Sequence, residues 1–156
     1  MVSIDLPLAS PPACHKSTTS PTRDVDGIVK LVNDDGMTVV SSVSTHFHWD
    51  HIGAKQKDVG MGPMRIPGVF ELASAGVPCH IPSWELAAAA VQTGLQEQDL
   101  TPISDNQCIR VGRFELEFLH TPGHSSGSMC IRVTGKANES ESKQAVDLLI
   151  TGRCNF

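Results

Sequence analysis

The segment THFHWDH, residues 45–51, places three histidines and one aspartate within seven residues. It follows residues 37–45, MTVVSSVST, whose β-branched composition predicts a strand. Side chains two residues apart on an extended segment point the same way, so His46 and His48 are expected to project together just past this strand. Two imidazoles on one side of a chain can bind a metal ion at about 2.0–2.1 Å. The segment therefore predicts a metal site at a strand end.

Asp50 and His51 follow where the chain is expected to turn into a short helix. They can face a second metal position, and paired metals about 3.5–4 Å apart are a known hydrolytic device. Neutral imidazole together with carboxylate suits zinc or iron better than calcium or magnesium. The cluster therefore predicts one or two zinc ions, with iron as the alternative metal.

A second histidine-bearing stretch is HTPGHSSGSM, residues 120–129. His124 follows Pro122 and Gly123, a turn pair after an alternating strand that ends at His120. Such a turn could direct His124 at the first cluster and complete a three-histidine site with one position left for water. Water bound to such a metal has a pKa of about 7, so hydroxide is available at neutral pH.

The histidines outside these two stretches are His15, His80 and His120. We expect them to be structural or surface residues. His120 has an alternative role as an outer partner, because ligand imidazoles often need a supporting group.

The rest of the pattern predicts one α/β (α+β) domain, a mixed sheet with helices packed on a face. Predicted helices are residues 24–36, capped by Asp24, a short helix from residue 50, residues 70–76, and residues 84–94, capped by Ser83 and ended by Gly94. Predicted strands are residues 37–45, 77–81, 108–120, 128–135 and 148–151. Residues 53–69, 95–106 and 136–147 are predicted to be loops.

Residues 1–23 are rich in Ser, Thr and Pro and show little periodicity. They are predicted to be a disordered or loosely attached arm without strands. The predicted domain then covers residues 24–156.

Composition narrows the function classes. The net charge of -5 argues against a nucleic-acid partner, and no apolar run approaches the roughly 18 residues of a membrane span. Five cysteines without a C-x-x-C pair argue against a disulfide framework and favour a reducing compartment. We expect a cytoplasmic protein acting on a small molecule. The N-terminal composition leaves import into an organelle open, and the oligomeric state is unknown.

THFHWDHIG resembles the H-x-H-x-D-H motif of the metallo-β-lactamase fold superfamily. HTPGHSSGSM resembles its second metal motif, in the form seen in hydroxyacylglutathione hydrolases (glyoxalase II), and DLLITG resembles the strand that leads into its third motif, usually T-G-D. The resemblance covers about residues 25–152. It implies a four-layer αββα sandwich with mixed β-sheets and a site at the sheet edges.

The same resemblance implies the ligand set. His46, His48 and His124 would bind the first zinc ion, and Asp50 and His51 the second. Asp50 would also orient the attacking hydroxide, which makes it the implied catalytic residue.

Three departures from the family pattern stand out. Arg153 occupies the position of the aspartate that bridges both metals, and a cation there would repel them. The family's final histidine ligand lies beyond the position of Phe156, and its opening strands have no counterpart in residues 1–23. We therefore expect an incomplete sandwich, apparently truncated at both ends relative to the family.

Replacements for the bridging aspartate are few. Asp147 should lie at the wrong end of its strand, and Asp105 lies in a polar loop. Cys154 could reach a metal as thiolate. The alternative is that Arg153 and Cys154 simply lie on the surface or in the core.

Three functions follow from the resemblance, and whether the chain is an enzyme stays open. The first is a zinc-dependent thioester or ester hydrolase, with a glutathione thioester as a possible small-molecule substrate. The second is a truncated, weakly active or non-catalytic metal-binding protein that lacks the bridging aspartate and the final histidine. The third is a persulfide-dioxygenase-like iron protein, which is disfavoured because the missing aspartate is an iron ligand in those relatives.

Overall fold

The computed structural model describes residues 2–5, 18–19, 24–58, 60, 62–136 and 145–152. In chain order the elements are β1 (Val2–Asp5), β2 (Thr18–Thr19), α1 (Val25–Asp34), β3 (Val39–Val43), α2 (Trp49–Ile52), β4 (Ala54–Asp58), β5 (Pro63–Ile66), α3 (Val69–Ser74), β6 (Cys79–Pro82), the 3-10 turn η1 (Ser83–Glu85), α4 (Leu86–Thr93), the 3-10 turn η2 (Glu97–Asp99), β7 (Thr101–Ile103), β8 (Cys108–Val111), β9 (Phe114–His120), β10 (Met129–Lys136) and β11 (Ala145–Ile150).

A mixed sheet has the strand order β2-β1-β3-β6-β7, in which β3, β6 and β7 run parallel and β1 is antiparallel to β3. Helices cover one face of this sheet. Val32 of α1, Leu72 of α3 and Ala89 of α4 pack in one core with Ile81 of β6. Because parallel strands share an edge for their carboxyl ends, the chain leaves β3 and β6 on the same side of the sheet.

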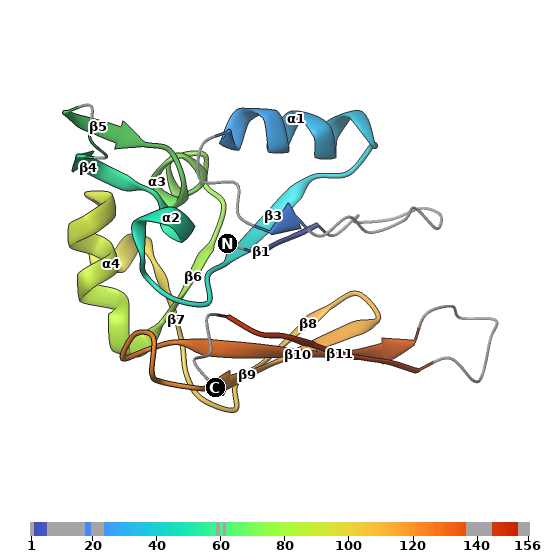
Figure 1. Ribbon diagram of the computed structural model, residues 1–156. Coiled ribbons are helices and arrows are strands. Elements are labelled where there is room, and N and C mark those ends of the chain that lie inside the picture. Colours follow the sequence, from blue (N-terminus) through green and yellow to red (C-terminus); the bar gives the residue numbers. More distant parts are fainter. Residues whose placement is uncertain are drawn as a thin grey trace.

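A second sheet is an antiparallel meander in the order β11-β10-β9-β8. Leu116 and Phe118 of β9 are buried, whereas Glu115 and Glu117 alternate with them and face outward. The buried side chains meet Val43 of the mixed sheet in a second core. Figure 1 shows the resulting layers, with α1 above β3 and the four-stranded sheet below. The predicted α/β sandwich with mixed sheets is therefore confirmed.

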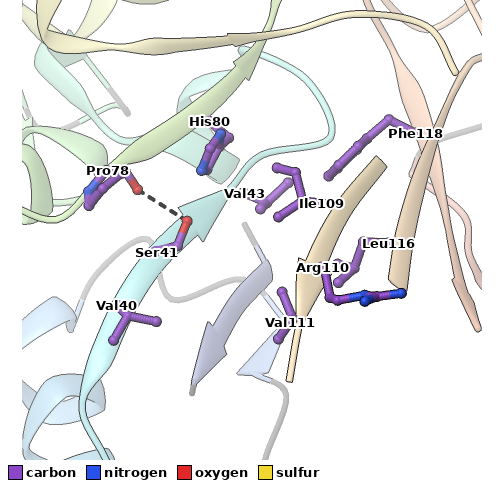
Figure 2. Close-up of a pocket in the computed structure, with 10 residues that line it drawn as sticks. All are labelled: Val40, Ser41, Val43, Pro78, His80, Ile109, Arg110, Val111, Leu116 and Phe118. Carbon is purple, nitrogen blue, oxygen red and sulfur yellow. Dashed lines mark hydrogen bonds between the residues drawn. The ribbon is translucent and has the colours of Figure 1, made fainter. Parts of the chain in front are cut away.

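A pocket of about 230 Å³ separates the two sheets beside β3 and β8. Figure 2 shows Val43 and Ile109 facing each other across it, with Phe118 and His80 nearby. Burial lowers the pKa of His80, which keeps its imidazole neutral. His80 thus lines an internal gap between the sheets.

Helix ends follow the predicted chemistry in two cases. Asp24 caps α1, since its Oδ1 accepts a hydrogen bond from Gly27 N at 2.9 Å. Gly94 ends α4 in the left-handed conformation, with φ of 81°. The predicted Ser83 cap is wrong: Ser83 begins the turn η1 without a side-chain cap bond, because α4 starts only after Glu85. No described helix has the length and apolar character needed to cross a bilayer.

The prediction that no strand lies within residues 1–23 is wrong for β1 and β2. Val2 pairs with Val43 and Ser3 with Ser42, so this strand depends on a partner far along the chain and has no strong local pattern. Residues 6–17 and 20–23, with Cys14 and His15, lie outside the described residues, and the predicted arm and its boundary at residue 24 stay predictions.

Two predicted loops also contain strands. Residues 53–69 hold the antiparallel pair of β4 and β5, and residues 95–106 hold η2 and β7. Neither segment shows clean apolar alternation, because β4 and β5 are mostly exposed and β7 has only three residues. The predicted loop at residues 136–147 ends in β11, which starts at Ala145, and residues 137–144 are not described.

Cysteines in the described part of the chain form no disulfide with one another: Cys79 and Cys130 are buried and Cys108 is exposed. Burial raises the pKa of the Cys79 thiol to about 12, which keeps it protonated. These thiols therefore behave as packing or surface groups, and none belongs to the described set of side chains with metal-ligand spacing.

Candidate metal centre

The chain stays tied to both sheets after β3 ends. Ser44 N donates a hydrogen bond to His80 O at 3.0 Å, and Thr45 O accepts one from Met129 N at 2.9 Å. The two bonds attach this segment to β6 on one side and to β10 on the other. They carry the next residue, His46, into the interior between the sheets.

His46 is fully buried. Its Nδ1 lies 3.1 Å from Thr45 Oγ1, a contact that fixes the orientation of the ring. Its Nε2 is buried and finds no hydrogen-bond partner within the described part of the chain. Buried polar atoms nearly always have a partner, so this nitrogen is suited to a group outside the protein chain, such as a metal ion.

Burial first, and then the neighbouring imidazoles of His51, His48 and His124, lower the pKa of His46 to about 3, while the Asp50 carboxylate opposes them. The imidazole is therefore neutral at physiological pH. A neutral imidazole offers the lone pair that metal coordination requires.

Three histidines from the two predicted motifs converge. The ligand nitrogens of His46, His48 and His124 all lie within 4.8 Å of one another. Nδ1 of His48 is 2.8 Å from Nε2 of His124. Two imidazole nitrogens this close share either a proton or a cation, because two facing lone pairs repel. The side chains of His46 and His48 therefore converge, and His124 approaches them, as the two motifs predict.

Asp50 and His51 lie beside this group on the short helix α2. The ring centroids of His51 and His46 are 4.0 Å apart, and His51 Nε2 is 3.8 Å from Asp50 Oδ2. Among the described residues, the group whose ligand atoms have metal-ligand spacing consists of His46, His48 and His124. It does not include Asp50 or His51. The structure therefore places Asp50 and His51 next to the site, and their role as ligands stays a prediction.

Hydrogen bonds within the loop between β9 and β10 hold His124 in place. Thr121 N donates to Ser128 O at 2.8 Å, which closes the base of the loop. Ser125 N donates to Ser128 Oγ at 3.1 Å, directly beside His124. This internal bonding gives the loop a defined shape.

His120 also supports this loop. Its Nε2 lies 2.9 Å from Ser126 O, and its ring stacks on Trp84 at 3.9 Å between centroids. The sequence left open that His120 supports a ligand imidazole. In the structure it contacts the backbone of the loop at Ser126.

Glu85 is a site residue that sequence reasoning missed. Its side chain is buried, with Oε2 accepting from Phe47 N at 2.9 Å and Oε1 from Gly127 N at 2.8 Å. Gln92, seven residues later, donates from Nε2 to Phe47 O at 2.5 Å. Glu85 is the sole charged residue in segment 83–94, but an acidic residue near a helix start is common and does not by itself indicate a site.

The candidates for a bridging carboxylate lie elsewhere, as expected. Asp147 forms an exposed ion pair with Arg132 at 3.0 Å, and Asp105 Oδ1 accepts a hydrogen bond from His120 N. A Cβ on Gly152 would lie 3.1 Å from Thr45 Cβ, so the end of the described chain reaches the site. Arg153 and Cys154 lie outside the described residues.

Comparison with known proteins supplies a context for this geometry. No family model matches the chain. A protein of Aquifex aeolicus (strain VF5), described only as uncharacterized, is 32% identical over a 125-residue alignment that covers 71% of this chain and 50% of that protein. An atrochrysone carboxyl ACP thioesterase of Aspergillus chevalieri is 29% identical over 106 residues, which are 68% of this chain and 27% of that protein.

Solved structures agree on the architecture. A metallo-β-lactamase from Staphylococcus aureus subsp. aureus COL has a TM-score of 0.53 and 22% identity, covering 74% of this chain and 29% of that one. A B3 metallo-β-lactamase with an active-site glutamic acid has a TM-score of 0.60 and 18% identity, covering 83% and 49%.

The chain has the metallo-β-lactamase fold. It spans half the length of the Aquifex protein and about a quarter of the Aspergillus thioesterase. In this fold, His46 and His48 lie just after β3, and His124 lies in the loop between β9 and β10.

Proposed function

We propose that this chain binds a metal ion through His46, His48 and His124 and acts as a metal-dependent hydrolase. The observation that carries the proposal is the buried Nε2 of His46, which has no described hydrogen-bond partner and lies among the ligand nitrogens of two further histidines. Three imidazoles that leave one position open are the donor set of hydrolytic metal sites.

Zinc is the metal proposed, with iron as the alternative, because neutral imidazoles suit both. When bound, zinc supplies Lewis acidity that makes water a competent nucleophile near neutral pH. The chain contributes the remaining conditions. Burial keeps His46 neutral, and the carboxylate of Asp50 lies on the adjacent helix α2, where it can accept a proton from water and orient it.

A second metal ion would be held by Asp50 and His51. Support comes from the 4.0 Å ring separation of His51 and His46, which places the His51 imidazole against the first site. The two residues are 3.8 Å apart at His51 Nε2 and Asp50 Oδ2, so both can face one ion.

The proposed substrate is a small thioester or ester, with a glutathione thioester as a candidate. Support comes from the likeness of residues 120–129 to the second motif of hydroxyacylglutathione hydrolases, and from the thioesterase among the relatives. The proposed setting is the cytoplasm, where such thioesters occur with reduced thiols.

A metal-binding protein with little or no turnover is the second candidate. Arg153, at the position of the metallo-β-lactamase bridging aspartate, favours it. A guanidinium near two metal ions would weaken binding of the second ion.

Metal analysis combined with a thioester hydrolysis assay tests these proposals. The hydrolase predicts at least one zinc ion per chain and turnover that His46→Ala abolishes. Bound metal without turnover would select the second candidate. A chain with neither metal nor turnover would contradict both.

A further inference from the structure

We infer that Glu85 is a positioning residue, whose carboxylate joins the two histidine-bearing loops and thereby sets the spacing of the metal ligands. This inference rests on the proposed metal site. Within the described part of the chain, the hydrogen bonds of Glu85 reach the backbone of the two loops, and through that backbone it acts on the histidine rings.

The two bonds of Glu85 reach both halves of the site. Oε2 accepts a hydrogen bond from the N–H of Phe47, the residue between His46 and His48, at 2.9 Å. Oε1 accepts one from the N–H of Gly127, three residues after His124, at 2.8 Å. One carboxylate therefore spans two segments that are 80 residues apart in sequence, Phe47 and Gly127.

Because Glu85 is buried, its carboxylate depends on these two hydrogen bonds. Glu85 is 2% exposed, and a buried carboxylate is costly unless hydrogen bonds satisfy it. The residue stands at the start of α4 but makes no side-chain cap bond to its own helix. Capping therefore does not explain the carboxylate, whereas the two bonds to the ligand loops do.

The backbone of the second loop approaches Glu85 very closely. A Cβ on Gly127 would lie 2.6 Å from Glu85 Cγ and 3.2 Å from Pro82 Cβ. The hydrogen bond from the Gly127 N–H depends on this approach. A side chain at position 127 would push the loop and its histidine away from the carboxylate.

The first loop is held from the same side by a second residue. Gln92 Nε2 donates to Phe47 O at 2.5 Å and lies 3.3 Å from Gly53 O. The N–H and C=O of Phe47 are thus bound by Glu85 and Gln92 from one helical segment. The peptide between the two histidines has little freedom to rotate, so the ligand nitrogens are held ready for a metal.

The variant Glu85→Gln tests the inference, because an amide keeps the length of the side chain but accepts through one oxygen only. Its remaining NH₂ group would face an N–H, so one of the two loop bonds is lost. Glu71→Gln is the matched control. The Glu71 carboxylate also accepts a backbone bond, from Gly68 N at 2.6 Å, and pairs with Arg65, so its partners lie outside residues 46–48 and 120–129.

Two readouts separate the inference from the proposed function. Hydrogen exchange in the metal-free protein should accelerate at the amide of Phe47, of Gly127, or of both in Glu85→Gln, while the core amides of Ile81 and Leu116 keep their protection. Zinc affinity, measured by competition with a chelator, should fall about 10- to 100-fold in Glu85→Gln, the usual cost of losing a supporting partner, and should be unchanged in Glu71→Gln.

Unchanged zinc affinity in Glu85→Gln would overturn the inference and leave the proposed metal site standing. Unchanged exchange at both amides would also overturn it. A wild-type chain that binds no zinc would refute the proposed function, and the exchange result alone would then decide whether Glu85 joins the loops. If Glu85→Gln does not fold, Gly127→Ala provides the same comparison, because its methyl group displaces the carboxylate.

Discussion

Nδ1 of His48 lies 2.8 Å from Nε2 of His124, although the two residues are 76 positions apart in the chain. His48 follows the mixed sheet, and His124 lies between β9 and β10 of the antiparallel sheet. The stacking of the two sheets therefore determines whether the proposed metal site exists. Anything that shifts one sheet against the other should weaken metal binding.

Removing any one of the three histidines should remove the metal. We expect His48→Ala or His124→Ala to weaken zinc binding by more than the roughly 100-fold typical of losing an outer partner, because each deletes a ligand itself. Metal content after dialysis measures the effect. His80→Ala is the control, since His80 lines the pocket between the sheets, and it should retain zinc.

The stability of the metal-free protein should fall in acid. The unfolded chain takes up a proton at His46 near pH 6.5, whereas the folded chain does so only near pH 3. Between these values the unfolded state binds more protons, so the free energy of unfolding decreases as the pH falls. Above pH 6.5 the neutral imidazole of His46 costs the folded state no such stability.

Denaturant unfolding of the metal-free protein across this pH range provides the measurement. His46→Gln should show a shallower loss of stability than the wild type, because it lacks the titrating imidazole. Identical pH profiles for the two proteins would show that His46 titrates normally in the folded state.

Asp50→Asn should separate turnover from binding at the three histidines. If Asp50 orients the attacking water, thioester hydrolysis should fall about 10²- to 10⁴-fold, the range for loss of a general base. At least one zinc ion should remain, held by the histidine group. Hydrolysis at the wild-type rate would exclude the proposed role of Asp50.

Gly127→Ala should destabilise the fold through its contact with Glu85. The added methyl would lie 2.6 Å from Glu85 Cγ, and overpacking of this kind costs about 1–3 kcal/mol. Combining it with Glu85→Gln in a double-mutant cycle should give a coupling of about 0.5–3 kcal/mol, since both changes act on the contact between Glu85 and Gly127. Purely additive effects would mean that the two residues act independently.

Local patterns in the sequence predict much of the site. His46, His48 and His124 converge as the two motifs predict, although the chain bends at residues 45–46 just after β3 instead of staying extended. Strands such as β9 were visible because Leu116 and Phe118 alternate with charged residues. In these segments the local preference and the tertiary structure agree.

Features that depend on distant partners were not visible. β1 forms because Val2 pairs with Val43, a residue far along the chain. The exposed hairpin of β4 and β5 shows almost no apolar pattern. Glu85 resembles any acidic residue near a helix start until the structure shows Phe47 and Gly127 at its two oxygens. Hydrogen bonds between residues far apart in the chain produce no periodic pattern that could be recognised in the sequence.

Anomalous diffraction at the zinc absorption edge, from crystals grown with zinc, tests the central claim most directly. The account predicts a peak about 2.0–2.1 Å from a ring nitrogen of each of His46, His48 and His124, with Nε2 as the ligand atom of His46. The absence of a peak at this position in zinc-saturated crystals, or a peak bound by other residues, would contradict it.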